Sequence, residues 1–320
     1  MKILFPTNWN DYELLDSGDG KRLERFGEYV LVRPDPQIIW KPRLAETVWK
    51  EADAVFEKIT QDKGKWIYKN TLPDKWLMRY KDLAFYVKLT PFKHTGVFPE
   101  QAVQWDFISR VIARNSAKQN NTAPLRSAQI TNNEIASPPI QSGTRKDDVR
   151  ILNLFGYTGI ASLAAAQAGA KVTHVDASRP TISWARENQE ASKLNDQPIR
   201  WILDDALKFC QREIKRGNTY DGIIMDPPVY GHGPEGELWK FSESFPKLLQ
   251  ICRQLLSDKP LFVIVNAYAI SASALMLQNV LEDYFNDLQG TIEVGELALQ
   301  EKNSHRLLST GIFGRWSSKL

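Results

Sequence analysis

The chain has 320 residues, of which 42% are hydrophobic and 25% charged. These fractions are typical of a folded globular protein and exclude a wholly disordered, collagenous or coiled-coil chain. The net charge of +3 is too small to indicate a nucleic-acid partner by itself.

The two cysteines, Cys210 and Cys252, lack the CxxC spacing of a zinc site and are too few for a disulfide framework. We therefore expect no metal and a reducing, cytoplasmic setting. The first residues, MKILFPTNWN, do not contain the long apolar run of a signal peptide. The most apolar stretch, 261–277, contains polar residues and is shorter than the about 20 residues that span a bilayer, so no membrane association is expected.

Residues 1–113 are expected to form a smaller, β-rich or mixed N-terminal domain with a possible role in substrate recognition. Short apolar runs flank Ser17-Gly18-Asp19-Gly20, which is the pattern of a β-hairpin. Aromatic and β-branched residues dominate 65–92 and favour further strands. The excess of positive charge is shared between residues 1–113 and 114–148, because residues 149–320 are nearly neutral.

Residues 114–148 are rich in Ser, Asn, Gln, Thr and Pro and contain almost no large apolar side chains. Such a segment cannot bury enough surface to offset the entropy of ordering it. We expect a flexible linker or insertion here.

Residues 149–320 alternate between apolar strand patterns and helical patterns. Strands are expected at 149–155, 171–176, 199–203, 220–226, 261–267, 291–299 and 306–314, with helices ending at Gly169 and covering about 179–194, 206–216, 245–256 and 272–284. The last two strands have no room for a helix between them. This alternation predicts a doubly wound α/β fold, with a seven-stranded, mostly parallel sheet and one reversed strand. Ligands of such sheets bind at the carboxyl ends of the strands.

A glycine-containing turn, NLFGYTG, follows the first of these strands. Gly156 and Gly159 permit a sharp turn and a close approach of the backbone to a ligand. The dinucleotide fingerprint GxGxxG and the phosphate loop GxxxxGK[ST] are both absent. By itself, the motif favours an ordinary turn between a strand and a helix.

Acidic residues end the next two strands. Asp176 is placed to accept hydrogen bonds from ribose hydroxyls, and Asp205 from an exocyclic amine of adenine. The alternatives are a helix N-cap for Asp176 and, for Asp204 and Asp205, an acidic first helical turn. Acids at successive strand ends together indicate a nucleoside ligand without a phosphate cradle.

The fourth strand ends in DPPVY. Pro227 and Pro228 remove two backbone donors and fix the turn, so their carbonyl groups are expected to face outward as acceptors. Asp226 adds a charged acceptor and Tyr230 a flat apolar face. The turn suits a planar substrate with an amino group, which would stack on Tyr230. A merely rigid turn is the alternative.

NLFGYTG, HVDAS, WARENQ, DDA and DPPVY, in this order and spacing, closely resemble the class I S-adenosylmethionine-dependent methyltransferases. Within that class the chain is similar to the bacterial group related to 23S ribosomal RNA methyltransferases. The segment HTGVFPEQ, 94–101, also resembles the family's TGxFxxQ segment, which lies over the cofactor.

The resemblance implies which residues bind the cofactor, S-adenosylmethionine. Asp176 would hold the ribose, Asp205 the adenine amine, and Asn188 would be a supporting, structural residue. The remaining cofactor-binding residues implied are Phe155, Gly156, Tyr157, Gly159, Ala177, Ala206, Gln101 and Asp226, the last beside the sulfonium. Asp226, Pro227 and Tyr230 would serve catalysis.

One departure from the family concerns the reaction. Methylation of cytosine at C5 needs a cysteine nucleophile, and the stretch after the fifth strand, VIVNAYAIS, contains none. Carbon methylation is therefore disfavoured, and nitrogen or oxygen remains as the methyl acceptor. Our leading hypothesis is methyl transfer to a nitrogen of a base in ribosomal or other RNA. Alternatives are a methyltransferase acting on a protein or small molecule, a non-catalytic nucleoside-binding module, and a nicotinamide oxidoreductase, which the missing GxGxxG disfavours.

Overall fold

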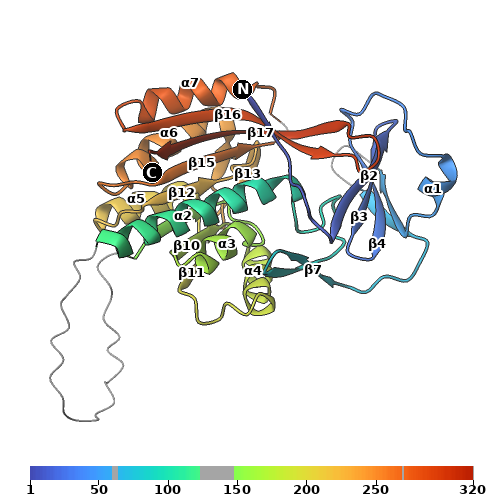
Figure 1. The fold of residues 1–320 in the computed structure, drawn as a ribbon, viewed down its shortest axis with the longest axis horizontal. Helices are drawn as coiled ribbons and strands as arrows, with labels where there is room; N and C mark the ends of the chain where they lie inside the picture. The colour runs from blue at the N-terminus through green and yellow to red at the C-terminus, as the bar shows by residue number, and fades with distance from the viewer. Residues whose placement is uncertain (60–63, 123–147, 269, 320) are drawn as a thin grey trace, which may run out of the picture.

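The computed structural model describes residues 1–59, 64–122, 148–268 and 270–319. A central sheet flanked by helices forms the larger part, and a small β-rich part lies beside one end of it (Figure 1). The predicted α/β class, with a separate β-rich N-terminal sheet, is confirmed.

The central sheet has eight strands in the order β1-β16-β17-β15-β12-β9-β10-β11. Their bounds are β1 (Lys2–Leu4), β9 (Arg150–Leu154), β10 (Lys171–Asp176), β11 (Ile199–Leu203), β12 (Gly222–Met225), β15 (Phe262–Ala267), β16 (Gly290–Gln300) and β17 (Leu307–Ser318). The seven predicted strands are present, and β17 is antiparallel to both of its neighbours, as expected. The expected count of seven is wrong by one, because β1 adds to the edge, parallel to β16.

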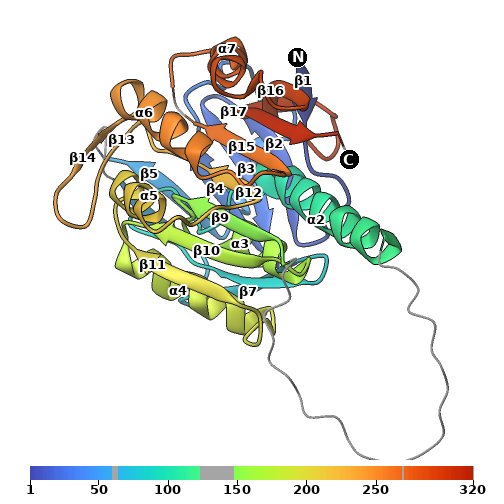
Figure 2. The ribbon, with the colours of Figure 1, turned by 90° about the vertical axis from the view of Figure 1, so that its left-hand side faces the viewer.

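Helices cover both faces of this sheet (Figure 2). The cluster of buried side chains on one face includes residues of α5 (Ala206–Lys215), α6 (Phe241–Gln254) and α7 (Ala274–Phe285). The other face is covered by α2 (Ala102–Thr122) and α3 (Ile160–Gln167), with α4 (Arg179–Ala191) next to α3. None of the described helices is long and apolar enough to cross a membrane.

The N-terminal part contains a five-stranded sheet and a hairpin. The sheet consists of β2 (Tyr12–Gly18), β3 (Lys21–Phe26), β4 (Tyr29–Pro34), β5 (Ala54–Lys58) and β6 (Gly64–Tyr68), with the short α1 (Glu46–Lys50) between β4 and β5, and the hairpin is β7 (Trp76–Tyr80) with β8 (Leu83–Val87). A β-hairpin forms at the predicted turn as β2–β3, whereas the apolar run 29–34 is β4 and pairs with β3. Asp19 and Gly20 both have positive φ, as the two-residue turn between β2 and β3 requires.

The structure differs from the expected domain boundaries in two places. Helix α2 begins at Ala102 and continues to Thr122, well past residue 114, where we expected the linker to start. The first strand of the chain belongs to the central sheet instead of the N-terminal domain. The second difference arises from pairing with the distant strand β16, which local composition does not report. The rest of the expected linker, 123–147, lies outside the described residues.

Long elements join the two parts. The outer ends of β16 and β17 extend to the N-terminal sheet, where Leu299 and Leu308 are buried in the same cluster as Trp9 and Leu14. On the other side, the backbone N–H of Tyr86 in β8 donates to Asn188 of α4 over 2.8 Å. These contacts fix the segment between β8 and α2 above the carboxyl ends of the central strands.

A buried ion pair stabilises the N-terminal sheet. Glu24 is fully buried and accepts two hydrogen bonds of 2.7 Å from the guanidinium of Arg33 and one of 2.8 Å from the Tyr12 hydroxyl. We predict that Glu24→Gln lowers the free energy of unfolding by about 3 kcal/mol, because it leaves Arg33 charged and uncompensated in the interior.

Urea-induced unfolding followed by tryptophan fluorescence measures this change. The matched control is Glu46→Gln in the exposed pair with Lys50 on α1, which should leave the midpoint unchanged. Equal midpoints for both variants would contradict the assigned role of Glu24.

Candidate functional site

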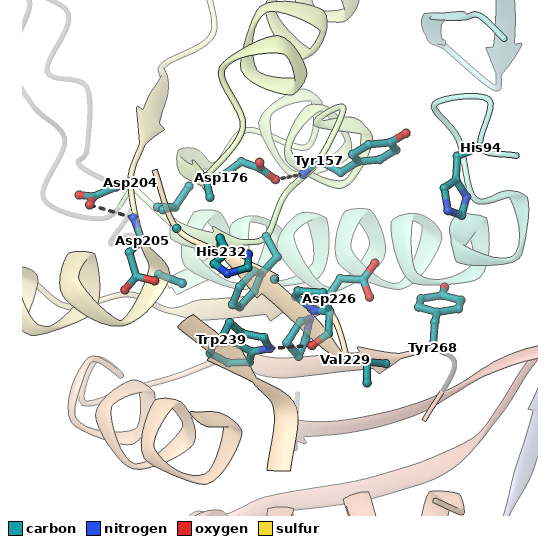
Figure 3. Close-up of a pocket in the computed structure, with 18 of the residues that line it drawn as sticks. His94, Tyr157, Asp176, Asp204, Asp205, Asp226, Val229, His232, Trp239 and Tyr268 are labelled. Atoms are coloured by element: carbon teal, nitrogen blue, oxygen red, sulfur yellow. Dashed lines mark hydrogen bonds between the residues drawn. The ribbon is translucent and has the colours of Figure 1, made fainter. Parts of the chain in front are cut away.

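A cavity of about 470 Å³ opens at the carboxyl ends of the central strands (Figure 3). Its size is typical of a site for a small molecule or cofactor. It is lined by His94, Phe98, Phe155, Tyr157, Val175, Asp176, Ala177, Asp204, Asp205, Ala206, Asp226, Pro227, Pro228, Val229, Gly231, His232, Gly233, Trp239 and Tyr268. A smaller adjoining cavity of about 40 Å³ includes Gln101 and Gly156 in its wall and shares Asp226 with the first.

The turn after β9 has an unusual backbone. Phe155 and Tyr157 both have left-handed φ angles, 55° and 51°, which cost free energy in residues with large side chains. Between them, a Cβ on Gly156 would lie 2.3 Å from the ring of the buried His174. Gly159 lines neither cavity. A glycine is needed at this position because of its φ of +83° and its close contact with Ala185. The two glycines are therefore explained by contacts within the fold, while Phe155 and Tyr157 face the cavity.

Asp176 lies at the end of β10 and is not the N-cap of α4, which is Ser178. One carboxylate oxygen accepts from the backbone N–H of Ser178 and from the hydroxyl of Thr181, at the start of α4. The other accepts from the backbone N–H of Tyr157 over 2.8 Å, which ties the β9 turn to the β10 turn. Burial raises the pKa of Asp176, and the hydrogen bonds oppose this effect.

Asp205 is both a helix cap and a cavity residue. It is the N-cap of α5, where its Oδ1 accepts from the backbone N–H of Lys208 over 2.9 Å. Its Oδ2 makes no hydrogen bond with the described residues, and Asp205 is part of the cavity wall. Asp204 accepts from the backbone N–H of Asp205 and pairs with Arg212.

Asp226 follows β12 and lies between the two ends of the cavity (Figure 3). Its Oδ2 accepts a hydrogen bond of 2.6 Å from the side-chain amide of Gln101, which belongs to the short helix η1 (Pro99–Gln101). Burial, reinforced by the nearby charge of Glu100, raises the pKa of Asp226 to about 7, although the Gln101 hydrogen bond opposes this. Asp226 therefore changes charge near neutral pH.

The turn after Asp226 is only partly as expected. Pro227 and Pro228 line the cavity, but the Pro228 carbonyl is not free, because it accepts 2.6 Å from the indole of the buried Trp239. This contact anchors the hairpin of β13 (Tyr230–His232) and β14 (Leu238–Lys240) over the cavity. Tyr230 does not line the cavity: its side chain is 58% exposed and its ring contacts that of His232.

Aromatic side chains that the sequence did not single out form the end of the cavity opposite Asp205 (Figure 3). The Phe98 ring lies 5.3 Å from that of His94, 5.7 Å from that of Tyr157 and 5.5 Å from that of Tyr268. Burial, together with the charges of Arg33, Lys93 and Arg22, lowers the pKa of His94 to about 4, so this imidazole is neutral. Tyr157 was among the expected cofactor-binding residues, whereas the only signal for His94 and Phe98 was their position within HTGVFPEQ.

Neither cysteine reaches the site. Cys210 and Cys252 are fully buried on α5 and α6, in the cluster below one face of the sheet. Among the described residues, no group of three His, Cys, Asp or Glu side chains is arranged to hold a metal ion.

Known proteins of similar structure and sequence are methyltransferases. The chain is 38% identical to a S-adenosylmethionine-dependent methyltransferase from Agrobacterium tumefaciens, over 100% of this chain and 94% of that one, with a TM-score of 0.87. A putative methyltransferase in complex with S-adenosylhomocysteine shares the fold, with a TM-score of 0.66, 19% identity and coverage of 97% of this chain and 76% of that one. No known family model matches the chain.

Among curated proteins, the chain is 31% identical over 141 residues to the ribosomal RNA large subunit methyltransferase I of Pseudoalteromonas translucida. This match covers 44% of the chain and 34% of that protein, so the chain spans about a third of the length of this relative. The identity and coverage of the Agrobacterium tumefaciens structure are high over nearly its full length. The chain therefore belongs to the S-adenosylmethionine-dependent methyltransferases, and S-adenosylmethionine is its cofactor.

Proposed function

We propose that this enzyme transfers a methyl group to a nitrogen of a base in RNA, ribosomal RNA being the first candidate. The observation that carries the proposal is Asp226, an acceptor whose pKa is close to 7, in the middle of a cavity with acids at one end and aromatic rings at the other. An RNA substrate is supported by the partial similarity to ribosomal RNA large subunit methyltransferase I.

The residues at the acidic end fit the cofactor. We assign the ribose hydroxyls to Asp176, whose carboxylate retains acceptor capacity beyond its three hydrogen bonds, and the adenine amine to the free Oδ2 of Asp205. Ala177 and Ala206, which follow these acids, leave room for the nucleoside. We assign the methionine part of S-adenosylmethionine to the β9 turn, with Phe155, Gly156 and Tyr157, and to Gln101 in the adjoining cavity.

We assign binding of the nitrogen that receives the methyl group to Asp226 and the neighbouring Pro227. When bound, S-adenosylmethionine supplies an activated methyl group, and the C–S bond breaks as the lone pair of the acceptor nitrogen forms the new C–N bond. Ionised Asp226 accepts a hydrogen bond from the acceptor amine, orients its lone pair and takes the proton that the nitrogen loses. Gln101 holds this carboxylate in position.

Nitrogen is favoured over carbon as the acceptor because no cysteine lines the cavity. The two buried cysteines cannot attack a base without unfolding the helices that carry them. A cytoplasmic location, as predicted from the sequence, is part of this proposal.

Transfer of a tritiated methyl group tests the substrate class. We expect the purified enzyme to label RNA prepared from cells that lack it, and to leave RNA from wild-type cells unlabelled because the site is already methylated. Protein and small-molecule fractions of the same cells are the comparison. Label confined to either of those fractions would refute the proposal.

Asp226 should set the pH dependence of the reaction. With a pKa of about 7, its carboxyl is protonated below that pH and cannot accept the amine hydrogen, so methyl transfer should rise with pH through about 7. The cationic cofactor favours the ionised form of Asp226. In the complex with S-adenosylmethionine, methyl transfer therefore rises at or below this pH. Asp226→Asn keeps an acceptor for Gln101 but should lower kcat about 100-fold and remove the pH dependence. A variant with wild-type turnover or an unchanged profile would show that Asp226 is not the orienting group.

Asp205 offers a separate test of cofactor binding. Asparagine caps a helix about as well as aspartate, so Asp205→Asn should keep α5 intact while turning an amide N–H₂ toward the adenine amine. We expect the dissociation constant for S-adenosylhomocysteine, measured by titration calorimetry, to rise about tenfold. Asp287→Asn, which loses only an ion pair with Arg253 and does not line the cavity, is the control and should bind normally. Equal affinities for the two variants would exclude Asp205 from the adenine site.

A further inference from the structure

The Tyr268 hydroxyl is a buried polar group in the cavity that the assignments above leave unused. It follows β15, and its oxygen is buried without a hydrogen bond to any described residue. A buried hydroxyl without a partner costs free energy and calls for an explanation.

Contacts on two sides hold the Tyr268 ring in place. One side lies against Gly311 of β17, where an added Cβ would come within 2.7 Å of the ring. On another side is Phe98, with its centroid 5.5 Å away and its plane inclined by 33°. The ring therefore has little freedom, and its hydroxyl has a fixed position in the site.

The hydroxyl is a permanent hydrogen-bond donor. Burial, followed by the charges of Glu100 and Asp226, raises the pKa of Tyr268 well above its usual value. The side-chain amide of Gln101 lies beside it and donates to Asp226 over 2.6 Å, but it makes no hydrogen bond of normal geometry with the Tyr268 hydroxyl. The cavity thus presents a donor, Tyr268, close to an acceptor, Asp226, as Figure 3 shows.

We propose that Tyr268 is a substrate-contact residue that selects a base carrying an amino group next to a ring acceptor, as adenine and cytosine do. Asp226 accepts from the amino group, the Tyr268 hydroxyl donates to the adjacent ring nitrogen, and Phe98 packs against the face of the base. The inference rests on the proposed function, since it names the chemical class of the acceptor at the same site.

The same pattern rejects uracil and hypoxanthine. Both carry a carbonyl in place of the amino group and an N–H in place of the ring acceptor, so an oxygen would face the Asp226 carboxylate and two donors would face each other. Tyr230, on the exposed strand β13, is not needed for this recognition.

Tyr268→Phe removes one oxygen and keeps the ring. With the RNA that the wild-type enzyme labels, we expect kcat/KM to fall about tenfold, as for the loss of one hydrogen bond, with an unchanged dissociation constant for S-adenosylhomocysteine. Tyr284→Phe on α7, remote from the cavity, is the matched control and should behave as the wild type. Wild-type kcat/KM in Tyr268→Phe, or an equal loss in both variants, would overturn the inference and leave the methyltransferase assignment intact.

A second measurement does not depend on methyl transfer. With the protein saturated with S-adenosylhomocysteine, saturation-transfer NMR should detect cytidine binding in preference to uridine, and adenosine in preference to inosine. Tyr268→Phe should reduce both preferences. If the wild-type protein binds the members of each pair equally, Tyr268 does not select the base, whatever macromolecule is methylated.

Discussion

The parallel pairing of three neighbouring strands determines where every part of the site lies. Leu154, the last residue of β9, is the register partner of both Val175 in β10 and Met225 in β12. The turns that begin at Phe155, Asp176 and Asp226 therefore start at the same level of the sheet. Because backbone hydrogen bonds fix this register, side chains from segments 70 residues apart line one cavity.

A second constraint comes from the segment that precedes α2. The hydroxyl of Thr158, in the β9 turn, donates to the Gly96 carbonyl over 2.6 Å, and Gln101 donates to Asp226. These hydrogen bonds place His94 and Phe98 over the strand ends and close one side of the cavity. The N-terminal domain thus contributes part of the wall of the methyltransferase site.

The two ends of the cavity differ in charge. Asp176, Asp204 and Asp205 line the end assigned to the nucleoside of the cofactor, whereas the neutral His94 and the aromatic rings of Phe98 and Tyr268 line the other. Asp226 lies between them, where burial holds its pKa near 7. An environment of this kind suits a cationic donor at one side and a flat, uncharged acceptor at the other.

The sequence by itself determined the alternating elements, and with them the class of fold, the parallel sheet and the edge at which Asp176, Asp205 and Asp226 meet. Apolar periodicity and the residues at strand ends are local properties, so they can be predicted without coordinates. Only the tertiary structure decided that β1 completes the sheet, that α2 passes residue 114, that the Pro228 carbonyl is occupied by Trp239 and that Tyr230 lies outside the cavity. It also brought Tyr268 beside Phe98. Apart from the length of α2, these outcomes depend on contacts between residues far apart in the chain, and no spacing within one segment encodes which distant side chain will arrive there.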